Sequence, residues 1–454
     1  MKIFVIPKKL LCLFLFFIVG QLYAQNPFFK DYSKTWTTKM FLSKPDGKGG
    51  CQINLTFEQA LEVIKEADNL SLGVPKIVYL VGWQYGGHDD KYPAFFEVND
   101  LLKRAEDASG IESMRWLIRE AKKYHTTISV HINMTDAYDD SPLWKEYVEK
   151  DLISKNQDGS LKVIGEYNGR KAYQINYRNE WEAGMTQWRI DRLLEVLPEL
   201  KEAGTIHSDA WIARDSEGHR ETIVTEALYQ QKAALYWRAK GIDITTEWVM
   251  DYMIGFVPVY WHFNGYTQND YLKYPASICC GVGLNPDLKK SDFGLGFLFG
   301  ESCYGEPFWG KENWTKGRLI EDDFFLKFPH FYFLNHFDRL SVEGTGNNRV
   351  AHYSDGVKVS LADQTITQWG RTLRKGNTIF IPALWRQDRG VIAYSTEAGD
   401  KLFDTPFNWS GLKRVKIMQI TKSGLKELTE KKLSGDKLAL RLEAKTPYYV
   451  LPVE

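Results

Sequence analysis

Two carboxylates lie in successive β-type runs near the middle of the chain. Asp209 is in the run Gly204–Trp211 (GTIHSDAW), and Glu247 is in the run Asp243–Trp248 (DITTEW). Glycoside hydrolysis needs such a pair, because one carboxylate attacks or assists at the anomeric carbon while an acid protonates the leaving oxygen. Neighbouring strands lie about 4.8 Å apart, so carboxyls at two adjacent strand ends can meet the roughly 5 Å spacing of a retaining enzyme. Asp209 and Glu247 are therefore the candidate catalytic residues.

Asp209 and Glu247 also fit a structural role. Judged by spacing alone, carboxylates at such positions are more often ordinary loop residues or ion pairs at the rim of a barrel. Glu247 is followed by Trp248, and an aromatic neighbour can desolvate a carboxyl and keep it protonated as an acid. Both interpretations stay open at this point.

Polar residues also lie within or directly after two earlier strand-like runs. His88 and Asp89 follow the run KIVYLVGW, and His131 and Asn133 lie in the run TISVHIN. In parallel α/β barrels the active site forms at the carboxyl ends of the strands. We therefore expect these four side chains to line the same site as the two carboxylates.

The histidines offer an alternative chemistry. His88, His131 and His207 can bind a metal, with Asp89 or Asp209 completing the ligand set. No HExxH or CxxC spacing supports such a site. The sequence also has neither a Gly-rich phosphate loop nor a GxSxG nucleophile elbow. We therefore predict a site without metal or cofactor.

The residues that carry this chemistry are separated by amphipathic stretches. From Leu55 to about Leu340, short β-branched or aromatic runs alternate with longer runs of helical periodicity, which is typical of βα units. Four such units in succession predict an α/β fold, a (β/α)8 TIM-type barrel over residues 25–350. Among the later segments, Gly294–Gly300 is a candidate strand and Asp322–Arg339 a candidate helix.

After about Asp355 the hydrophobic period changes to two. Eight short alternating runs follow, separated by turn residues such as Ser434-Gly435-Asp436. This pattern predicts a small C-terminal all-β sandwich over residues 351–454. No Pro/Ser-rich linker precedes it, so we expect the two parts to pack together.

The composition of the chain limits the kinds of molecule that it can bind. The chain has 454 residues, Lys+Arg 58 against Asp+Glu 58, a net charge of +0, and 14% aromatic residues. A neutral chain lacks the basic surface that a nucleic acid needs, and one so rich in aromatics is not disordered. Most of the rings should fill the core, but Trp83, Trp248 and Tyr173 lie near the polar strand ends. We predict that they stack on a carbohydrate substrate, with no nucleic-acid partner, and we leave the oligomeric state open.

The first residues have the pattern of a signal peptide. Three lysines precede the apolar run Leu10–Val19, and Ala24 offers a cleavage position. We expect residues 1–24 to be removed and the protein to be exported, either periplasmic or secreted. No later stretch is long and apolar enough to predict a membrane span.

Four cysteines remain after this cleavage: Cys51, Cys279, Cys280 and Cys303. An exported protein permits a disulfide, and Cys303 with Cys279 or Cys280 is the favoured pair. Buried free thiols fit the sequence equally well.

The polar runs resemble, in their order and spacing, glycoside hydrolase family 101, the endo-α-N-acetylgalactosaminidases, and more loosely the exo-acting family 129. The matching segments are Gly82-Trp83-Gln84 to Gly87-His88-Asp89, Val130 to Thr135, Ile206 to Asp209, Thr245 to Trp248, and Phe324 to Arg339.

The resemblance implies a role for each motif residue. Asp209 would be the nucleophile and Glu247 the general acid/base of a retaining mechanism. The pocket for the sugar would contain His88, Asp89, His131 and Asn133. The implied substrate is galactose-β1,3-GalNAc, α-linked to Ser or Thr of a mucin-type glycoprotein.

The chain departs from the family in two respects. Family 101 enzymes are much longer, and their paired tryptophans over the sugar are not found in the stretch Glu166–Gln174, where Tyr167 and Tyr173 can take that place. An exo-acting α-glycosidase and a glycan-binding protein without catalysis therefore remain alternatives.

Overall fold

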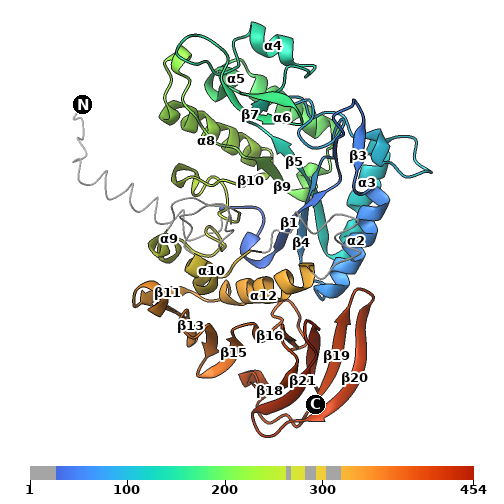
Figure 1. Ribbon diagram of the computed structural model, residues 1–454, viewed down its shortest axis with the longest axis vertical. Helices are drawn as coiled ribbons and strands as arrows, with labels where there is room; N and C mark the ends of the chain where they lie inside the picture. Colours follow the sequence, from blue (N-terminus) through green and yellow to red (C-terminus); the bar gives the residue numbers. More distant parts are fainter. Residues whose placement is uncertain (1–26, 262–266, 282–292, 303–318, 454) are drawn as a thin grey trace, which may run out of the picture.

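The first part of the molecule is built on a parallel β-sheet (Figure 1). The computed structural model describes residues 27–261, 267–281, 293–302 and 319–453. Five strands pair in chain order: β1 (Trp36–Phe41), β4 (Lys76–Val81), β5 (Thr126–Asn133), β9 (Thr205–Asp209) and β10 (Asp243–Thr246). The segments between them contain the helices α2 (Phe57–Leu70), α3 (Gly110–Ala121), α4 (Trp144–Glu149), α5 (Tyr177–Glu182), α6 (Met185–Val196), α7 (Leu200–Ala203) and α8 (Ile223–Ala239). This alternation confirms the predicted α/β class.

Helix α2 shows how the sequence sets these elements. It begins with a capping box, in which the Thr56 hydroxyl accepts from the Gln59 amide and the Gln59 side chain accepts from the Thr56 amide. Its buried residues, among them Phe57, Leu61 and Ile64, recur at helical spacing and form one apolar face. The neighbouring strand β4 is buried along its whole length, as expected for a parallel strand covered on both sides.

The parallel sheet is curved around an interior. The amide of Thr37 in β1 donates to the Tyr260 hydroxyl at 3.1 Å, and Lys39 in β1 forms an ion pair with Glu247, directly after β10. Side chains from the first strand therefore reach residues beyond the last one. Val259 and Cys279 add a parallel bridge. In the described ranges five strands pair in this sheet, and closure into an eight-stranded barrel stays a prediction.

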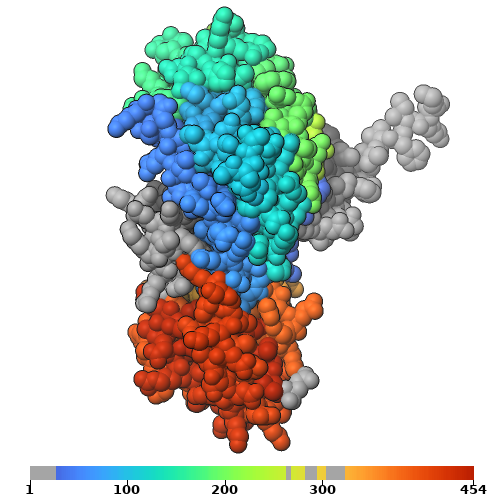
Figure 2. Space-filling view, turned by 90° about the vertical axis from the view of Figure 1, so that its right-hand side faces the viewer, coloured from blue at the N-terminus to red at the C-terminus, as the bar shows by residue number. Residues whose placement is uncertain are grey.

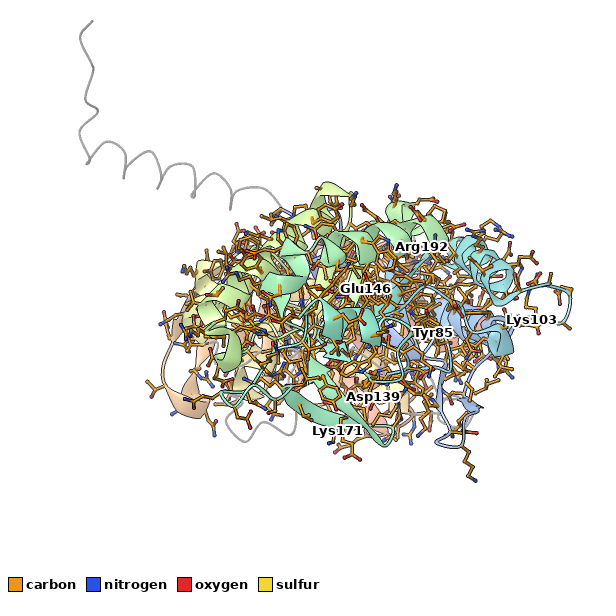
Figure 3. All side chains as sticks on the ribbon, turned by 90° about the horizontal axis from the view of Figure 1, so that it is seen from above. Tyr85, Lys103, Asp139, Glu146, Lys171 and Arg192 are labelled. Carbon is orange, nitrogen blue, oxygen red and sulfur yellow. The ribbon has the colours of Figure 1, made fainter. Side chains whose placement is uncertain are left out.

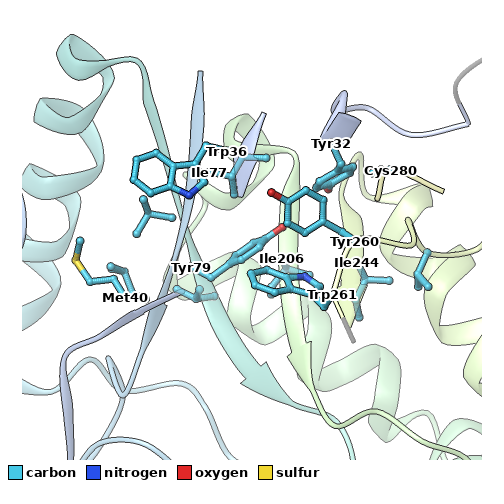
Figure 4. Close-up of a cluster of buried hydrophobic side chains, with 14 of the residues drawn as sticks. Tyr32, Trp36, Met40, Ile77, Tyr79, Ile206, Ile244, Tyr260, Trp261 and Cys280 are labelled. Atoms are coloured by element: carbon cyan, nitrogen blue, oxygen red, sulfur yellow. The ribbon is translucent and has the colours of Figure 1, made fainter. Parts of the chain in front are cut away.

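Polar side chains fill part of this interior. The Tyr32 and Tyr79 hydroxyls both share a hydrogen bond with Thr205 Oγ1, at 2.6 and 2.5 Å. Closer to the carboxyl ends of β9 and β10, Thr245 Oγ1 lies 2.9 Å from His207 Nδ1. Figure 4 shows Tyr32 and Tyr79 pointing toward each other between the strands. The sheet thus places buried hydroxyls beneath the strand ends that carry the candidate site.

One predicted element is wrong. Gly294–Gly300 is not a strand but lies largely in the helix α10 (Phe293–Phe299). Its buried side chains Leu295, Leu298 and Phe299 follow helical spacing, which outweighs the low helix propensity of Gly294 and Gly296. The other helices of this region are α9 (Gln268–Lys273) and α12 (Leu319–Leu334), and α12 corresponds to the predicted helix Asp322–Arg339.

The C-terminal part is all-β, as predicted. Ten antiparallel strands pair in the order β11 (Arg339–Glu343), β12 (Val350–Tyr353), β13 (Val357–Ser360), β14 (Thr365–Gln368), β15 (Arg371–Lys375), β16 (Thr378–Pro382), β17 (Val391–Ser395), β22 (Tyr448–Val453), β19 (Arg414–Thr421) and β20 (Gly424–Lys432). The pair β18 (Gly399–Asp404) and β21 (Lys437–Leu442) forms a second sheet. Phe380 of the first sheet stacks on Phe403 of the second at 4.6 Å, within a shared apolar core. The sheet begins at β11, ahead of residue 351, and the domain boundary itself stays a prediction.

The two parts pack directly on one another (Figure 2). The Asn69 side chain donates to the Lys422 carbonyl at 2.8 Å, and the Trp385 indole donates to the Ser71 carbonyl at 3.1 Å. Rings of α12 also meet the C-terminal part, since Phe325 stacks on Tyr394 with centroids 5.3 Å apart. These contacts fit the expectation of two packed parts.

Some predictions fall outside the described residues. The predicted signal peptide, residues 1–24, and Cys303 both do. Cys51, Cys279 and Cys280 are free thiols within the described ranges. In those ranges, too, no helix combines the length and the apolar character that crossing a membrane would require.

Candidate active site

The candidate site lies at the carboxyl edge of the parallel sheet. Strand register pairs Asn133 of β5 with Asp209 of β9, and Ser208 of β9 with Thr246 of β10. Glu247 directly follows β10, one residue beyond the pair of Thr246 and Ser208, and so lies at the same end of the sheet as Asp209. Side chains in register on neighbouring parallel strands project from the same face. The structure thus brings Asp209 and Glu247 to one edge, as predicted.

Two imidazoles face the Asp209 carboxylate. His131 Nε2 lies 3.5 Å and His88 Nε2 3.9 Å from Asp209 Oδ2. The two rings lie edge to face, with centroids 5.2 Å apart. A protonated imidazole in these positions stabilises the anionic form of a carboxylate, which is the form that a nucleophile needs.

A buried lysine faces Glu247. Lys39 Nζ forms an ion pair with Glu247 Oε1, and the two side chains are 1% and 14% exposed. Lys39 also lies beside the Trp261 ring, with Nζ 5.9 Å from its centroid. The sequence analysis missed Lys39, because the βα pattern was traced only from Leu55 onward and β1 precedes that point.

Asp89 is a third carboxyl of the site. It is buried in a left-handed conformation with φ of 55°, and its Oδ2 lies 3.4 Å from His88 Nδ1. Burial, opposed by the charge of His88 and assisted by the negative charges of Asp209 and Glu247, raises the pKa of Asp89 to about 6. Asp89 therefore shares one electrostatic environment with Asp209 and Glu247.

Asn133 has a positioning role in this structure. Its Oδ1 accepts from the amides of Thr135 and Asp136, at 2.7 and 2.8 Å, and its Nδ2 donates to Asp136 Oδ2 at 3.0 Å. These bonds fix the turn between β5 and β6 (Asp136–Ala137). The sequence analysis missed Asp136, whose pKa is raised to about 8 by burial and by the charges of Asp89 and Asp209.

The predicted stacking role of Trp83 is not supported. Trp83 is 0% exposed, and its indole donates to the His131 carbonyl at 2.9 Å, so it supports β5 rather than presenting a face to a ligand. Trp248 is half-buried, and Tyr173 packs on Trp144 with centroids 4.8 Å apart. Tyr167 is 44% exposed, and its pKa is raised by burial and by the site carboxylates Asp136, Asp89 and Asp209.

A β-hairpin, β7 (Val163–Tyr167) and β8 (Arg170–Gln174), adjoins the site and pairs with β6. The Asn168 side chain donates to the His88 carbonyl at 3.1 Å. Arg170 donates to Asp90 at 2.7 Å and to the Asp89 carbonyl, and it lies over the Tyr138 ring. Figure 3 shows this end of the molecule from above, with Lys171 of β8 and Asp139 labelled. The hairpin thus holds the loop that carries His88 and Asp89.

An open polar cavity of about 700 Å³ is lined in part by residues of that loop and of the hairpin. Tyr85, Asp90, Asp140, Asn168 and Arg170 are among its lining residues. Because Asn168 and Arg170 also contact the His88–Asp89 loop, the cavity adjoins the candidate site.

Three residues lie close enough together to hold a metal ion. His88, His131 and Asp209 each offer one ligand atom, and these atoms lie within 4.8 Å of one another. This set contains two of the three histidines that the sequence suggested and Asp209, one of the two carboxylates suggested with them, and it lacks His207. The same atoms serve equally well as the surroundings of a catalytic carboxylate.

Comparisons with known proteins agree with this geometry. Residues 48–272 match the model of a family described as endo-alpha-N-acetylgalactosaminidase. Solved structures of alpha-N-acetylgalactosaminidase NagBb from Bifidobacterium bifidum are similar in fold. The quadruple mutant matches with a TM-score of 0.54 and 12% identity over 77% of this chain, and the GalNAc complex with a TM-score of 0.53 and 12% identity over 78%. This chain covers 60% of the length of each. The motif-based prediction is therefore confirmed: over residues 48–272 the chain resembles glycoside hydrolase family 101.

Proposed function

We propose that the protein is a retaining glycoside hydrolase that cleaves α-linked N-acetylgalactosamine from mucin-type O-glycans. The observation that carries this proposal is the placement of Asp209 and Glu247 at one edge of a parallel sheet, inside the segment that matches the family. A closed (β/α)8 barrel, with the later part of the chain completing the circle, is part of the same proposal. So is export, for which the pattern of residues 1–24 provides the support.

The first step uses Asp209 as nucleophile. One carboxylate oxygen forms a bond to the anomeric carbon while the bond from that carbon to the Ser or Thr oxygen breaks. Glu247, in its protonated form, gives its proton to the departing oxygen. His88 and His131 hold the Asp209 carboxylate in place and disperse its charge.

The second step releases the sugar. Glu247, now ionised, takes a proton from water, the water oxygen attacks the anomeric carbon, and the bond to Asp209 breaks. The α-configuration is retained, because two inversions follow each other. In this proposal Asp89 and Trp248 contact the sugar during both steps.

A defined core-1 O-glycopeptide tests the proposal. Wild-type protein should release a sugar with the α-configuration, and Asp209→Asn and Glu247→Gln should each lose most of that activity. Release of disaccharide identifies endo action, and release of monosaccharide identifies exo action. Undiminished hydrolysis by either variant, or tight glycan binding without turnover by the wild type, would contradict the proposal.

A further inference from the structure

His88, His131 and Asp209 have nearly the geometry of an open metal site. His131 Nε2 and His88 Nε2 lie 3.5 and 3.9 Å from Asp209 Oδ2, and the ligand atoms of the set all lie within 4.8 Å of one another. About 3.3 Å separates the ligand atoms of a tetrahedral Zn²⁺ whose bonds are about 2.0–2.1 Å long. The set can therefore close onto an ion by movements of about an ångström, chiefly of His88, which lies on a loop and is 22% exposed.

The surroundings of His88 favour such an ion. Its other ring nitrogen, Nδ1, lies 3.4 Å from Asp89 Oδ2. A histidine that binds a metal usually donates its second N–H to a carboxylate or carbonyl, which fixes the tautomer and leaves the lone pair of the first nitrogen for the ion. Asp89 is thus placed as the outer partner that directs His88 Nε2 toward Asp209.

The donor atoms select the kind of ion. Two imidazole nitrogens and one carboxylate oxygen suit Zn²⁺ and similar transition metals, whereas Mg²⁺ and Ca²⁺ prefer oxygen ligands. Three protein ligands leave the fourth tetrahedral position open to water. The side chains of His88 and Asp209 are 22% and 16% exposed, so an ion can reach them from solvent.

We propose that His88, His131 and Asp209 form an inhibitory site for Zn²⁺, with Asp89 as its outer carboxylate. The ion binds the carboxylate that bonds to the anomeric carbon in the proposed first step, so metal and sugar exclude each other. Binding of the ion depends on the geometry of the set, whereas its inhibitory effect rests on the proposed function, with Asp209 as nucleophile. A metal that took part in catalysis would have the opposite effect, because removing it would lower the activity.

A second pair of histidine and carboxylate provides a matched control. His219 Nε2 lies 3.1 Å from Asp151 Oδ2, closer than either imidazole of the proposed site lies to Asp209. Its other nitrogen, Nδ1, lies 2.7 Å from the Ser216 hydroxyl. Among the described residues, this pair belongs to no set of three side chains that could hold a metal. Loss of His219 should therefore leave the proposed site intact.

Titration calorimetry with ZnCl₂ on untagged, chelator-treated protein tests the binding. We expect one equivalent to bind the wild type and His219→Ala equally well. His88→Ala and Asp209→Asn should weaken this binding by about 100-fold or more, and Asp89→Asn by about tenfold, since loss of an outer partner costs roughly 10–100-fold. MgCl₂ should not compete. No binding by the wild type, or unchanged binding by folded His88→Ala and Asp209→Asn, would overturn the inference.

Inhibition is measured separately, with a small aryl α-glycoside of GalNAc. Zn²⁺ should raise KM and leave kcat unchanged over the concentrations at which it binds, and a chelator should restore the original KM. A fall in kcat with no change in KM, or full activity of the Zn²⁺-loaded protein, would overturn the inhibitory role. The calorimetry uses no substrate, so a glycoside that is not hydrolysed contradicts the proposed function, while the calorimetry still decides the metal site.

Discussion

Asp136 allows a quantitative test of the electrostatics of the site. Its pKa is raised from 3.8 to about 8, because it is buried and lies close to the negative charges of Asp89 and Asp209. The folded protein therefore holds a proton on Asp136 that the unfolded chain releases near pH 4. A group of this kind removes stability as the pH rises between those two values.

The substitution Asp136→Asn replaces the neutral acid by a neutral amide of the same shape. When the folded state binds one proton more than the unfolded state, the free energy of unfolding falls by about 1.4 kcal/mol for each unit by which the pH rises. Between pH 5 and pH 7 the free energy of unfolding of the wild type should fall by about 3 kcal/mol relative to the variant. Urea unfolding at pH 5, 6 and 7 measures this difference.

The control is Asp139→Asn, an exposed neighbour in the same loop. It should follow the wild type at every pH. If the free energies of unfolding of wild type and Asp136→Asn also changed in parallel with pH, Asp136 would be ionised in the folded protein and the description of a strongly coupled carboxyl cluster would be refuted.

Three further predictions concern other parts of the site. Trp83→Phe leaves the His131 carbonyl without its buried donor and should lower the free energy of unfolding by about 2 kcal/mol, measured by urea unfolding; an unchanged value would contradict the supporting role. Tyr85→Ala, in the adjoining cavity, should lower kcat/KM for glycopeptides but not for a small aryl α-glycoside, and equal losses on both would refute a role of the cavity in binding the rest of the substrate. Dialysis against a chelator should leave hydrolysis unchanged, and loss of activity that added Zn²⁺ restores would instead favour a metal held by His88, His131 and Asp209.

The sequence predicted those features that depend on local pattern. Hydrophobic periodicity separated the α/β part from the all-β part, and polar residues at the ends of strand-like runs marked Asp209, Glu247, His88 and His131. Parallel strands bring their carboxyl ends to one edge, so order along the chain was enough to predict that these side chains gather.

Features that depend on tertiary contacts were beyond the sequence. Nothing in the run that contains Lys39 shows that the curved sheet will bring its ammonium to Glu247. Trp83 follows a strand as Trp248 does, yet only the packing shows that its ring is enclosed beneath His131. Asn133 and Asp136 form a turn whose hydrogen bonds use the amide that was expected to bind sugar.

The hairpin of β7 and β8 lies between these two cases, because its turn can be recognised in the sequence but its contacts cannot. Residues 163–174 contain Asn168-Gly169, a turn signal typical of β-hairpins that the sequence analysis did not use, and β7 and β8 form a hairpin there. The sequence alone does not show that Asn168 and Arg170 hold the loop of His88 and Asp89, because those contacts join residues about 80 positions apart.

The most direct test of the central claim is to trap the glycosyl-enzyme. Glu247→Gln should react with an aryl α-glycoside of GalNAc or its core-1 disaccharide, whose good leaving group needs no acid, and should then accumulate the intermediate because the base of the second step is missing. Mass spectrometry of the intact protein should show the addition of one glycosyl group, and peptide mapping should locate it on Asp209. An adduct on a different residue, or the absence of any adduct together with an inverted product, would contradict the assignment of Asp209 and Glu247 as a retaining pair.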